Sequence, residues 1–514
     1  MKRLDRLIAD TGRAVLRASE RISRCRFIVL MNQPKVLHVF SIAIAALLIS
    51  MAIGRPFWLD EIFTIQFNKH GNVLHTLTEL YKGADSQAPL YYGIMALVLG
   101  YVEPTQALIL RFTSIVLLLA ALPALRGLLR EWRIDSVFPL AVFLFAINGY
   151  VTTFIAIELR TYSLYFTLFI WILYFRSMHW REGGWKTGCV YALLLGMFLL
   201  THYIALYYVM ALFVLDAMLP GKLTLKTRML PFMAAFGVFG LWIPGLLAQW
   251  ELAGRASWAA PWGVLRIGTW VWEMFRSVTV LVVLGSTVAL LDLHRKGYAR
   301  SSLAQERMVL LVTALLPLAL AALSWFGLTI MFERYLIPSF AAMSLLSIIG
   351  IARLPDDTRT VLTAVVLMAG IYLGMHRAPI FREYNQREWL RINMIQAHAE
   401  SRVLVCESIS DFVEGKYYAT GDVGSNIYYA YDADLTDRGK DKLLINFATE
   451  LMLRNREMFG ASSIRSWGEF AKENDTFFFI DSPTEGIFDL ELKNNPTFKI
   501  ISVDTALYLI KKGP

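Results

Sequence analysis

Two adjacent carboxylates, Asp60 and Glu61, follow the first long apolar stretch of the chain directly. Charged groups at the boundary between a membrane and water are costly to desolvate and usually have a function. A carboxylate placed there can act as a general base that removes a proton from a hydroxyl group. Such a pair can also belong to a solvated loop, but the flanking Trp58 and Phe63 favour the chemical interpretation. We therefore take Asp60 and Glu61 as candidate catalytic residues.

Four further segments at the ends of apolar stretches carry side chains that can bind a substrate. Their candidate residues are Gln87, Tyr91, Tyr92, Glu158, Arg160, Tyr162, His202, Tyr203, Glu333, Arg334 and Tyr335. An arginine can hold a phosphate through its fork of donors. Simpler roles are open to each residue. The tyrosines can form an aromatic belt, and Arg334 can reach lipid phosphate. His202 can be a packed interfacial histidine, and Glu158 with Arg160 a structural ion pair.

The composition is that of a polytopic membrane protein. Of the 514 residues, 56% are apolar, and long apolar runs recur from Val36 to about Met375. The formal net charge of +9 does not indicate nucleic-acid binding, because most of the excess lies in the N-terminal tail and short loops, where membrane topology explains it. Three cysteines, far apart and without a CxxC spacing, argue against a disulfide framework or a cysteine zinc site. We expect no cleavable signal peptide.

The apolar runs predict eleven membrane spans. We place them near 36–53, 107–125, 136–155, 161–176, 188–200, 204–219, 229–248, 271–291, 308–328, 336–352 and 360–375. Clusters of arginine and lysine fall in alternate connecting loops, as expected for cytoplasmic loops. This alternation requires that the apolar segment 89–102 does not cross the bilayer. We expect a re-entrant or interfacial helix there, within a long outer loop over 54–106.

These features predict the domain organisation. Residues 1–35 form a basic cytoplasmic tail that is attracted to anionic lipid, and residues 36–376 form the membrane domain. From 377 to 514 the composition changes to a soluble α/β domain on the outer side. We predict strands at 402–406, 476–480, 498–503 and 506–510, and a helix at 441–459. The fold class is thus an α-helical polytopic membrane protein with a C-terminal α/β domain.

At this point the residues resemble a known family. A first span followed by an acidic pair is similar to the membrane-embedded C-type glycosyltransferases. The segment Pro89-Leu90-Tyr91-Tyr92, the Arg-x-Tyr at Arg160 and the late Glu333-Arg334-Tyr335 resemble one branch of that family. This branch contains the protein O-mannosyltransferases and the lipid A aminoarabinose transferases. The family often has His-Pro-Pro or Gln-Pro-Pro before Leu-Tyr-Tyr, whereas this chain has Gln87-Ala88-Pro89.

The resemblance implies a reaction. Family members take a sugar from a polyprenyl-phosphate carrier and transfer it, with inversion, to an acceptor hydroxyl at the outer face of the membrane. Asp60 matches the base position, and Arg334 and Arg160 are the cations available for the departing phosphate. The acceptor stays open between lipid A, core glycan, another glycan and protein. The resemblance also implies a bacterial inner membrane, with the site on the periplasmic side, and a role in modifying lipopolysaccharide or the cell envelope.

The sequence also bears on the cofactor and on competing functions. We see no Asp-x-Asp motif for a nucleotide sugar and no P-loop, which agrees with a lipid-linked donor. No cofactor is predicted, and dependence on a divalent metal stays open. A transporter or flippase of lipid-linked sugar is the main alternative, but it should show charges along a midplane path or paired broken helices. A sensor or scaffold whose outer domain binds a partner leaves the cluster around Asp60 unexplained.

Overall fold

The computed structural model describes most of the chain after residue 53. The described residues are 46, 54–146, 155, 158–254, 268–269, 272, 285–287, 302–324, 333–431, 452–481, 492–493, 495–504 and 506–513. The predicted tail 1–35 lies outside them, as do nearly all of the spans 36–53 and 271–291. The chain divides into two compact units, which we call the bundle unit and the sheet unit. The bundle unit comprises Met1–Ile53, Arg111–Gly240 and Pro261–Ile380, and the sheet unit comprises Gly54–Leu110, Leu241–Ala260 and Phe381–Pro514.

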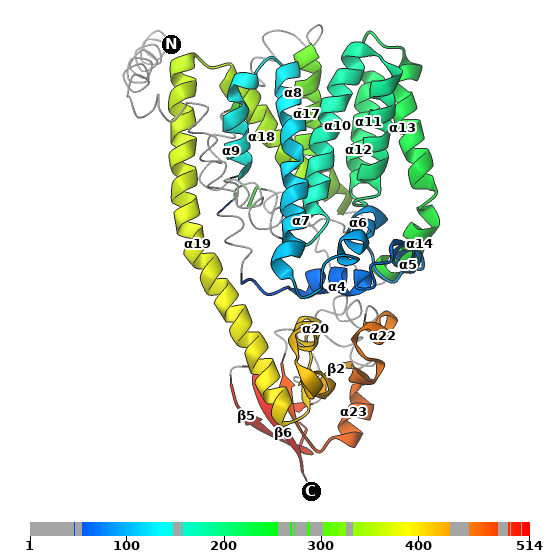
Figure 1. Ribbon diagram of the computed structural model, residues 1–514, viewed down its shortest axis with the longest axis vertical. Coiled ribbons are helices and arrows are strands. Elements are labelled where there is room, and N and C mark those ends of the chain that lie inside the picture. The colour runs from blue at the N-terminus through cyan, green and yellow to red at the C-terminus, as the bar shows by residue number, and fades with distance from the viewer. Residues whose placement is uncertain are drawn as a thin grey trace. The chain divides into compact units, whose positions relative to one another are not determined.

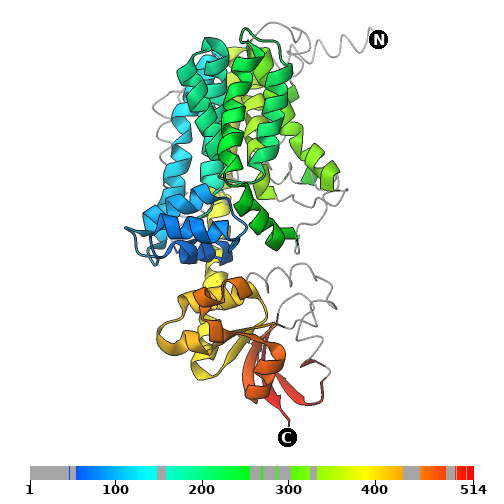
Figure 2. The ribbon, with the colours of Figure 1, turned by 90° about the vertical axis from the view of Figure 1, so that its right-hand side faces the viewer.

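Helices form the described part of the bundle unit. They are α7 (Ala107–Leu119, which begins in the sheet unit), α8 (Ala121–Glu131), α9 (Phe138–Ala146), α10 (Tyr162–Glu182), α11 (Trp185–Leu199), α12 (Ala205–Met218), α13 (Leu225–Gly240), α17 (Ser302–Ser324), α18 (Ile337–Ala352) and the first part of α19 (Asp356–Ser401). The 3-10 turns η1 (Asp135–Val137) and η4 (Glu333–Leu336) precede α9 and α18. The helices α10, α11 and α13 run side by side, and α17 packs on α18 (Figures 1 and 2).

Helix length and hydropathy agree with membrane spans. In the described part of the chain, Ala107–Glu131, Ala304–Leu323 and Arg334–Ala352 are each long and apolar enough to cross a bilayer. The helices α11 and α12 are apolar but shorter. The predicted span 229–248 consists instead of two helices, α13 and α14 (Ile243–Gly254). Pro244 accounts for the break, because its ring clashes with the carbonyl of the residue four positions earlier, and that residue is Gly240, the last of α13.

Three short helices of the sheet unit follow Gly54. They are α4 (Leu59–Asn68), α5 (Val73–Tyr81) and α6 (Pro89–Leu99), and α6 packs on both of the others. With 11 residues, α6 is about 16 Å long, whereas the hydrocarbon core of a bilayer is about 30 Å thick. A helix of this length agrees with the expectation that 89–102 does not cross the bilayer.

A six-stranded sheet lies at the C-terminal end of the chain. Its strands are β1 (Leu404–Cys406), β2 (Ile427–Tyr431), β3 (Ile464–Ser466), β4 (Thr476–Ile480), β5 (Phe498–Ser502) and β6 (Leu507–Lys512). Their order is β3-β2-β1-β4-β6-β5, with parallel pairing from β3 to β4 and antiparallel pairing from β4 to β5. The other elements are α20 (Ile409–Tyr418), α22 (Arg456–Phe459) and α23 (Trp467–Glu473), with the 3-10 turns η5 (Gly421–Asn426) and η7 (Ala461–Ser463).

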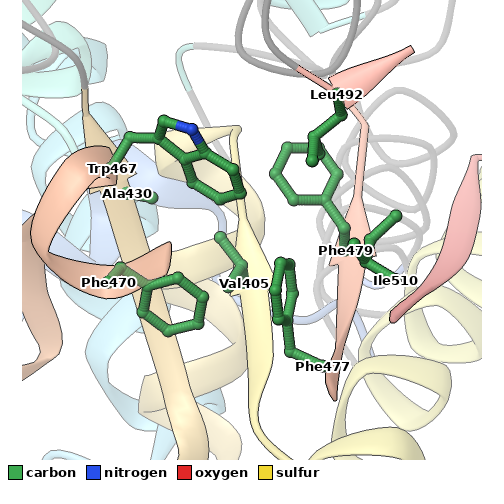
Figure 3. Close-up of a cluster of buried hydrophobic side chains, with 8 residues drawn as sticks. All are labelled: Val405, Ala430, Trp467, Phe470, Phe477, Phe479, Leu492 and Ile510. Atoms are coloured by element: carbon green, nitrogen blue, oxygen red, sulfur yellow. The ribbon is translucent and has the colours of Figure 1, made fainter. Parts of the chain in front are cut away.

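Alternation along the strands builds the core of this sheet. Phe477 and Phe479 of β4 lie on one face with Val405 and Ile510, where Trp467 and Phe470 of α23 cover them together with Ala430 and Leu492 (Figure 3). Between them, Phe478 points to the other face and meets His398 of α19 at 4.6 Å between ring centres. The four predicted strands are confirmed, whereas β2 and β3 were not predicted. Of the predicted helix 441–459, the described part includes α22 at its end.

Candidate functional site

The acidic pair lies in the first turn of α4, where its two members differ. Glu61 is fully buried, and its Oε2 atom accepts a hydrogen bond from the backbone N–H of Trp58 at 3.2 Å. Asp60 is only half-buried. Negative charge is favoured in the first turn of a helix, because the unsatisfied N–H groups there carry partial positive charge. Glu61 thus caps the helix, and Asp60 is the carboxylate of the pair that a substrate can reach.

The backbone that leads into α4 is held by the C-terminal part of the sheet unit. The indole N–H of Trp389 donates to the Gly54 carbonyl at 2.6 Å. The backbone N–H of Phe57 donates to the hydroxyl of Tyr418. The rings of Trp389 and Tyr418 meet edge to face at 5.0 Å, so the two anchors support each other. Residues more than 330 positions later therefore fix the segment just before Asp60.

The predicted aromatic residues of α6 are buried within this unit. Tyr91 and Tyr92 are buried, and Gln87 is half-buried just before the helix. The Tyr92 hydroxyl donates to Asp85 Oδ2 at 2.6 Å, and its ring meets Phe67 of α4 at 6.0 Å. Asp85, a buried carboxylate, was not predicted. It lies in the same loop as the predicted Gln87, and a carboxylate beside that segment was the signal available in the sequence.

The bundle unit brings together most of the other predicted residues. We call Glu158, Arg160, Tyr162, His202, Arg334 and Tyr335 the first cluster. The guanidinium of Arg334 lies over the ring of Tyr162, 5.9 Å from its centre. Glu158, Arg160 and Tyr335 also lie close enough to Tyr162 to influence its hydroxyl electrostatically. Thr161 donates to the Thr201 carbonyl at 2.9 Å and so ties the segment before α10 to the link between α11 and α12.

His202 lies in that link and belongs to the same cluster. Its ring centre is 4.5 Å from that of Tyr335 and 5.3 Å from that of Tyr165. Burial, with the positive charges of Arg160 and Arg334, lowers the pKa of His202 to about 3. The imidazole is therefore neutral at physiological pH, and it adds no positive charge beside the two arginines. Tyr203 is half-buried next to it.

The first cluster is suited to an anion. Its described side chains include two arginines and one carboxylate, with a neutral histidine between aromatic rings. Arg160 is buried and Arg334 is half-buried, so both are partly shielded from water and their attraction for a phosphate is strong. Glu333 begins η4, but its side chain lies outside the described ones. The cluster can thus hold a phosphodiester group.

Sequence reasoning missed a buried arginine beside this cluster. Arg111 of α7 is fully buried. One turn later, Ser114 donates to the Glu158 carbonyl at 2.8 Å, so this face of α7 meets the segment that carries Glu158 and Arg160. An arginine within the apolar run 107–119 was the available signal, since ionisable residues inside spans are rare and usually functional.

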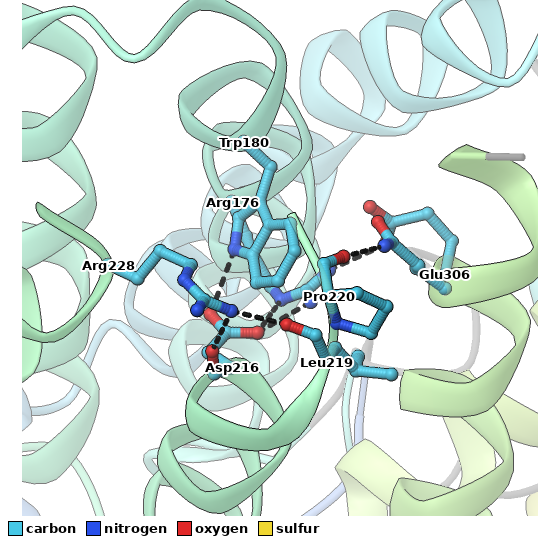
Figure 4. Close-up of polar contacts among 8 residues, drawn as sticks. Arg176, Trp180, Asp216, Leu219, Pro220, Arg228 and Glu306 are labelled. Atoms are coloured by element: carbon cyan, nitrogen blue, oxygen red, sulfur yellow. Dashed lines mark hydrogen bonds and ion pairs between the residues drawn. The ribbon is translucent and has the colours of Figure 1, made fainter. Parts of the chain in front are cut away.

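A second buried polar group lies at the other end of α10 and was also not predicted. We call Arg176, Trp180, Asp216, Arg228 and Glu306 the second cluster (Figure 4). Arg176 forms ion pairs with Asp216 at 2.5 Å and Glu306 at 3.0 Å. Trp180 donates to Asp216 Oδ2 at 3.1 Å and lies under the guanidinium groups of Arg176 and Arg228, 4.9 and 5.3 Å from them. The cluster joins α10, α12, α13 and α17.

The described residues contain no group of three or more histidine, cysteine, aspartate or glutamate side chains placed to hold a metal ion.

Comparisons with known proteins identify the fold. The structure is similar to ArnT from Cupriavidus metallidurans bound to undecaprenyl phosphate, with a TM-score of 0.58 and 12% identity over 94% of this chain and 100% of that one. The apo form of ArnT matches with a TM-score of 0.58 and 11% identity, over 93% and 98% of the two chains. AglB from Archaeoglobus fulgidus, an archaeal oligosaccharyltransferase in complex with an inhibitory peptide and a dolichol-phosphate, matches with a TM-score of 0.50 and 8% identity, over 86% and 69%. Neither a protein-family model nor a curated protein matches the sequence.

These similarities concern the fold. ArnT and AglB are both membrane-embedded C-type glycosyltransferases. The chain has their fold, and it is a multi-pass membrane protein. The resemblance seen in the sequence is thus confirmed at the level of the fold, and so is the fold class of a mostly helical membrane protein with a small C-terminal sheet.

Proposed function

We propose that the chain is an inverting glycosyltransferase that moves a sugar from a polyprenyl-phosphate carrier to an acceptor hydroxyl. The observation that carries this proposal is the first cluster, which sets two arginines against one described carboxylate. It occurs in a fold shared with ArnT, a protein that was crystallised with undecaprenyl phosphate. A cationic site for a lipid phosphate is what such a donor requires.

The base in this proposal is Asp60. As the acceptor oxygen attacks the anomeric carbon, its proton passes to the Asp60 carboxylate. The bond between the anomeric carbon and the phosphate oxygen breaks, and polyprenyl phosphate leaves with the electron pair. The partial exposure of Asp60 supports this role, as does its place in the first turn of α4. Glu61 is buried in a helix cap, so its proposed contribution is to fix the orientation of Asp60.

The arginines of the first cluster stabilise the leaving group. Arg334 and Arg160 bind the phosphate oxygens, whose negative charge grows as the sugar departs. Tyr162 and Tyr335 frame the arginines, and Glu158, His202 and Tyr203 contact the sugar or orient the cations. Gln87, Tyr91 and Tyr92 bind the substrate from the segment next to α4. Each of these roles is part of the proposal.

The proposal includes topology. The reaction takes place at the outer face of a bacterial inner membrane, residues 36–376 form the catalytic membrane domain, and residues 377–514 form an outer domain. The test is a single-cysteine scan in a background without Cys25, Cys189 and Cys406. Cysteines introduced at Thr105 and Lys472 should react with an impermeant thiol reagent in intact cells, and one at Lys226 should not. The reverse pattern would overturn the outer-face assignment.

The activity itself is tested with purified protein and a radiolabelled sugar on polyprenyl phosphate. We expect label to move to an acceptor fraction from the same envelope. Asp60→Asn keeps the shape of the side chain but removes its basicity, and it should lower the transfer rate by roughly 10² to 10⁴. Glu61→Gln is the matched control, because its amide oxygen can still accept from Trp58, so a smaller loss is expected. Near-normal transfer by Asp60→Asn would eliminate Asp60 as the base.

A further inference from the structure

A cavity of about 440 Å³ opens on the bundle unit beside α8. Its walls are the side of α8 from Leu122 to Arg130, Phe138 at the start of α9, and Tyr174 of α10. Tyr174 packs closely against α8 at Gly127. A Cβ atom there would lie 2.7 Å from the tyrosine ring, well inside van der Waals contact. The cavity is distinct from both the first and the second cluster.

Two arginines on the same face of α8 line this cavity. Arg126 and Arg130 are four residues apart, so their side chains are neighbours on the helix, where like charges repel each other. Arg126 lies over the ring of Phe138 at 5.8 Å. Within the described part of the chain neither guanidinium pairs with a carboxylate, and the adjacent Glu131 pairs with Arg181 instead. The cavity therefore has two positive charges and lacks a described negative one.

The walls change character along α8. Leu122 and Pro123 are apolar, and the arginines follow one and two turns later, at the end of the apolar helix Ala107–Glu131. In a membrane protein such a sequence runs from the hydrocarbon region towards the aqueous boundary. An acyl chain fits the apolar wall, and the forked donors of arginine fit a phosphodiester. Basic pockets between helix ends are known sites for anionic lipid head groups.

We propose that this cavity binds an anionic phospholipid, with its phosphate held by Arg126 and Arg130 and its glycerol and first acyl carbons against Leu122, Pro123 and Phe138. A free phosphate would leave the apolar wall without a partner, so the geometry favours the lipid. The site does not depend on the proposed transfer reaction.

The test is lipid binding by the purified, delipidated chain, measured by native mass spectrometry with phosphatidylglycerol and with phosphatidylcholine. Wild type should retain one phosphatidylglycerol at least about tenfold more tightly than phosphatidylcholine, as expected for charge-assisted hydrogen bonds. Arg126→Gln with Arg130→Gln should lose this preference. Lys222→Gln with Lys226→Gln removes two exposed charges elsewhere in the unit and should keep it.

Three outcomes would overturn the proposal. One is an unchanged preference in the arginine double variant. Another is an equal loss in the lysine double variant, which would indicate only general attraction by net charge. The third is complete displacement of the lipid by millimolar inorganic phosphate, which would indicate a free anion as the occupant. Both double variants change exposed residues, and thermal unfolding of each checks that it is folded.

Discussion

The two ends of α10 carry two polar clusters of opposite character. Tyr162 of the first cluster and Arg176 of the second are fourteen residues apart on one helix, about 21 Å along its axis. In the second cluster the buried Arg176 meets two carboxylates, and the Nη1 atom of Arg228 is satisfied by backbone carbonyls, at 2.7 Å in the case of Asp216. In the first cluster the described side chains set two arginines against one carboxylate.

From this difference we infer a structural role for the second cluster and a functional role for the first. A buried charge is tolerated when its partners within the protein satisfy it, and removing one partner then costs several kcal/mol. The second cluster meets this condition and ties four helices together. The described side chains of the first cluster include two arginines and one carboxylate, and we propose that an anionic ligand binds there. Changes in the second cluster should therefore affect folding, and changes in the first should affect the reaction.

The largest expected effect is that of Arg176→Ala. It leaves Asp216 and Glu306 buried without their shared cation, which should lower the free energy of unfolding by about 3–5 kcal/mol. The measurement is the thermal midpoint of the purified protein together with the monodisperse fraction. Arg181→Ala is the matched control, since its ion pairs are largely exposed and should contribute at most about 1 kcal/mol. An equal loss of stability in both variants would mean that the ion pairs of the second cluster do not hold its four helices together.

Arg334→Ala should have the next largest effect, on the reaction and not on folding. Loss of a group that stabilises developing charge lowers rates by roughly 10² to 10³. Arg334→Lys should also be impaired, because a point charge does not replace the fork of donors. Transfer assays and thermal midpoints for the two variants separate the effects. Normal turnover by Arg334→Ala would mean that Arg334 only contacts membrane lipid and does not hold the donor phosphate.

His202 predicts a smaller, pH-dependent effect. Since its pKa in the folded protein is lowered to about 3, the unfolded chain binds more protons below pH 6.5 than the folded one. The free energy of unfolding should thus fall as pH drops below about 6.5, by up to about 1.4 kcal/mol per pH unit, until about pH 3. His202→Phe keeps a ring against Tyr335 and removes the titration. A stability difference between wild type and this variant that does not change with pH would refute the assignment.

The anchor of α4 predicts the smallest effect. Tyr418→Phe removes the acceptor of the Phe57 N–H, an interaction of about 1 kcal/mol, so transfer should slow roughly fivefold while donor affinity is unchanged. Tyr428→Phe, on strand β2, removes a hydroxyl without such a partner among the described residues and serves as the control. If both substitutions slow transfer equally, the Tyr418 anchor does not position Asp60.

The sequence predicted the elements whose signal is local. Apolar runs located the helices α11, α12 and α18 within a few residues and the start of α10, which continues past its predicted end at 176 to Glu182. Short strand-like runs located β4 and β6. β3 was missed because two of its three residues, Arg465 and Ser466, are polar. The run Ile427–Tyr431 of β2 is as aromatic as that of β4 and was overlooked. The division of 229–248 could have been read from Pro244.

Contacts between residues far apart in the chain could not be predicted from the sequence. The first cluster could be proposed because its members lie at the ends of apolar runs, but the 4.5 Å contact of His202 with Tyr335 is a tertiary fact. The second cluster joins residues up to 130 positions apart. The sequence explained Arg176 and Arg228 as members of basic loop clusters, and only Asp216 lies inside a predicted apolar span. The hydrogen bond between Phe57 and Tyr418 joins residues 361 positions apart, and no local sequence pattern indicates it.

The most direct test of the account is the affinity of purified protein for undecaprenyl phosphate in wild type, Arg334→Ala and Asp60→Asn. If the first cluster binds the lipid phosphate and Asp60 only removes the proton, Arg334→Ala should bind at least about tenfold more weakly, whereas Asp60→Asn should bind as wild type does and fail in transfer. Arg126→Gln with Arg130→Gln should leave this affinity unchanged. Wild-type affinity in Arg334→Ala would contradict the account.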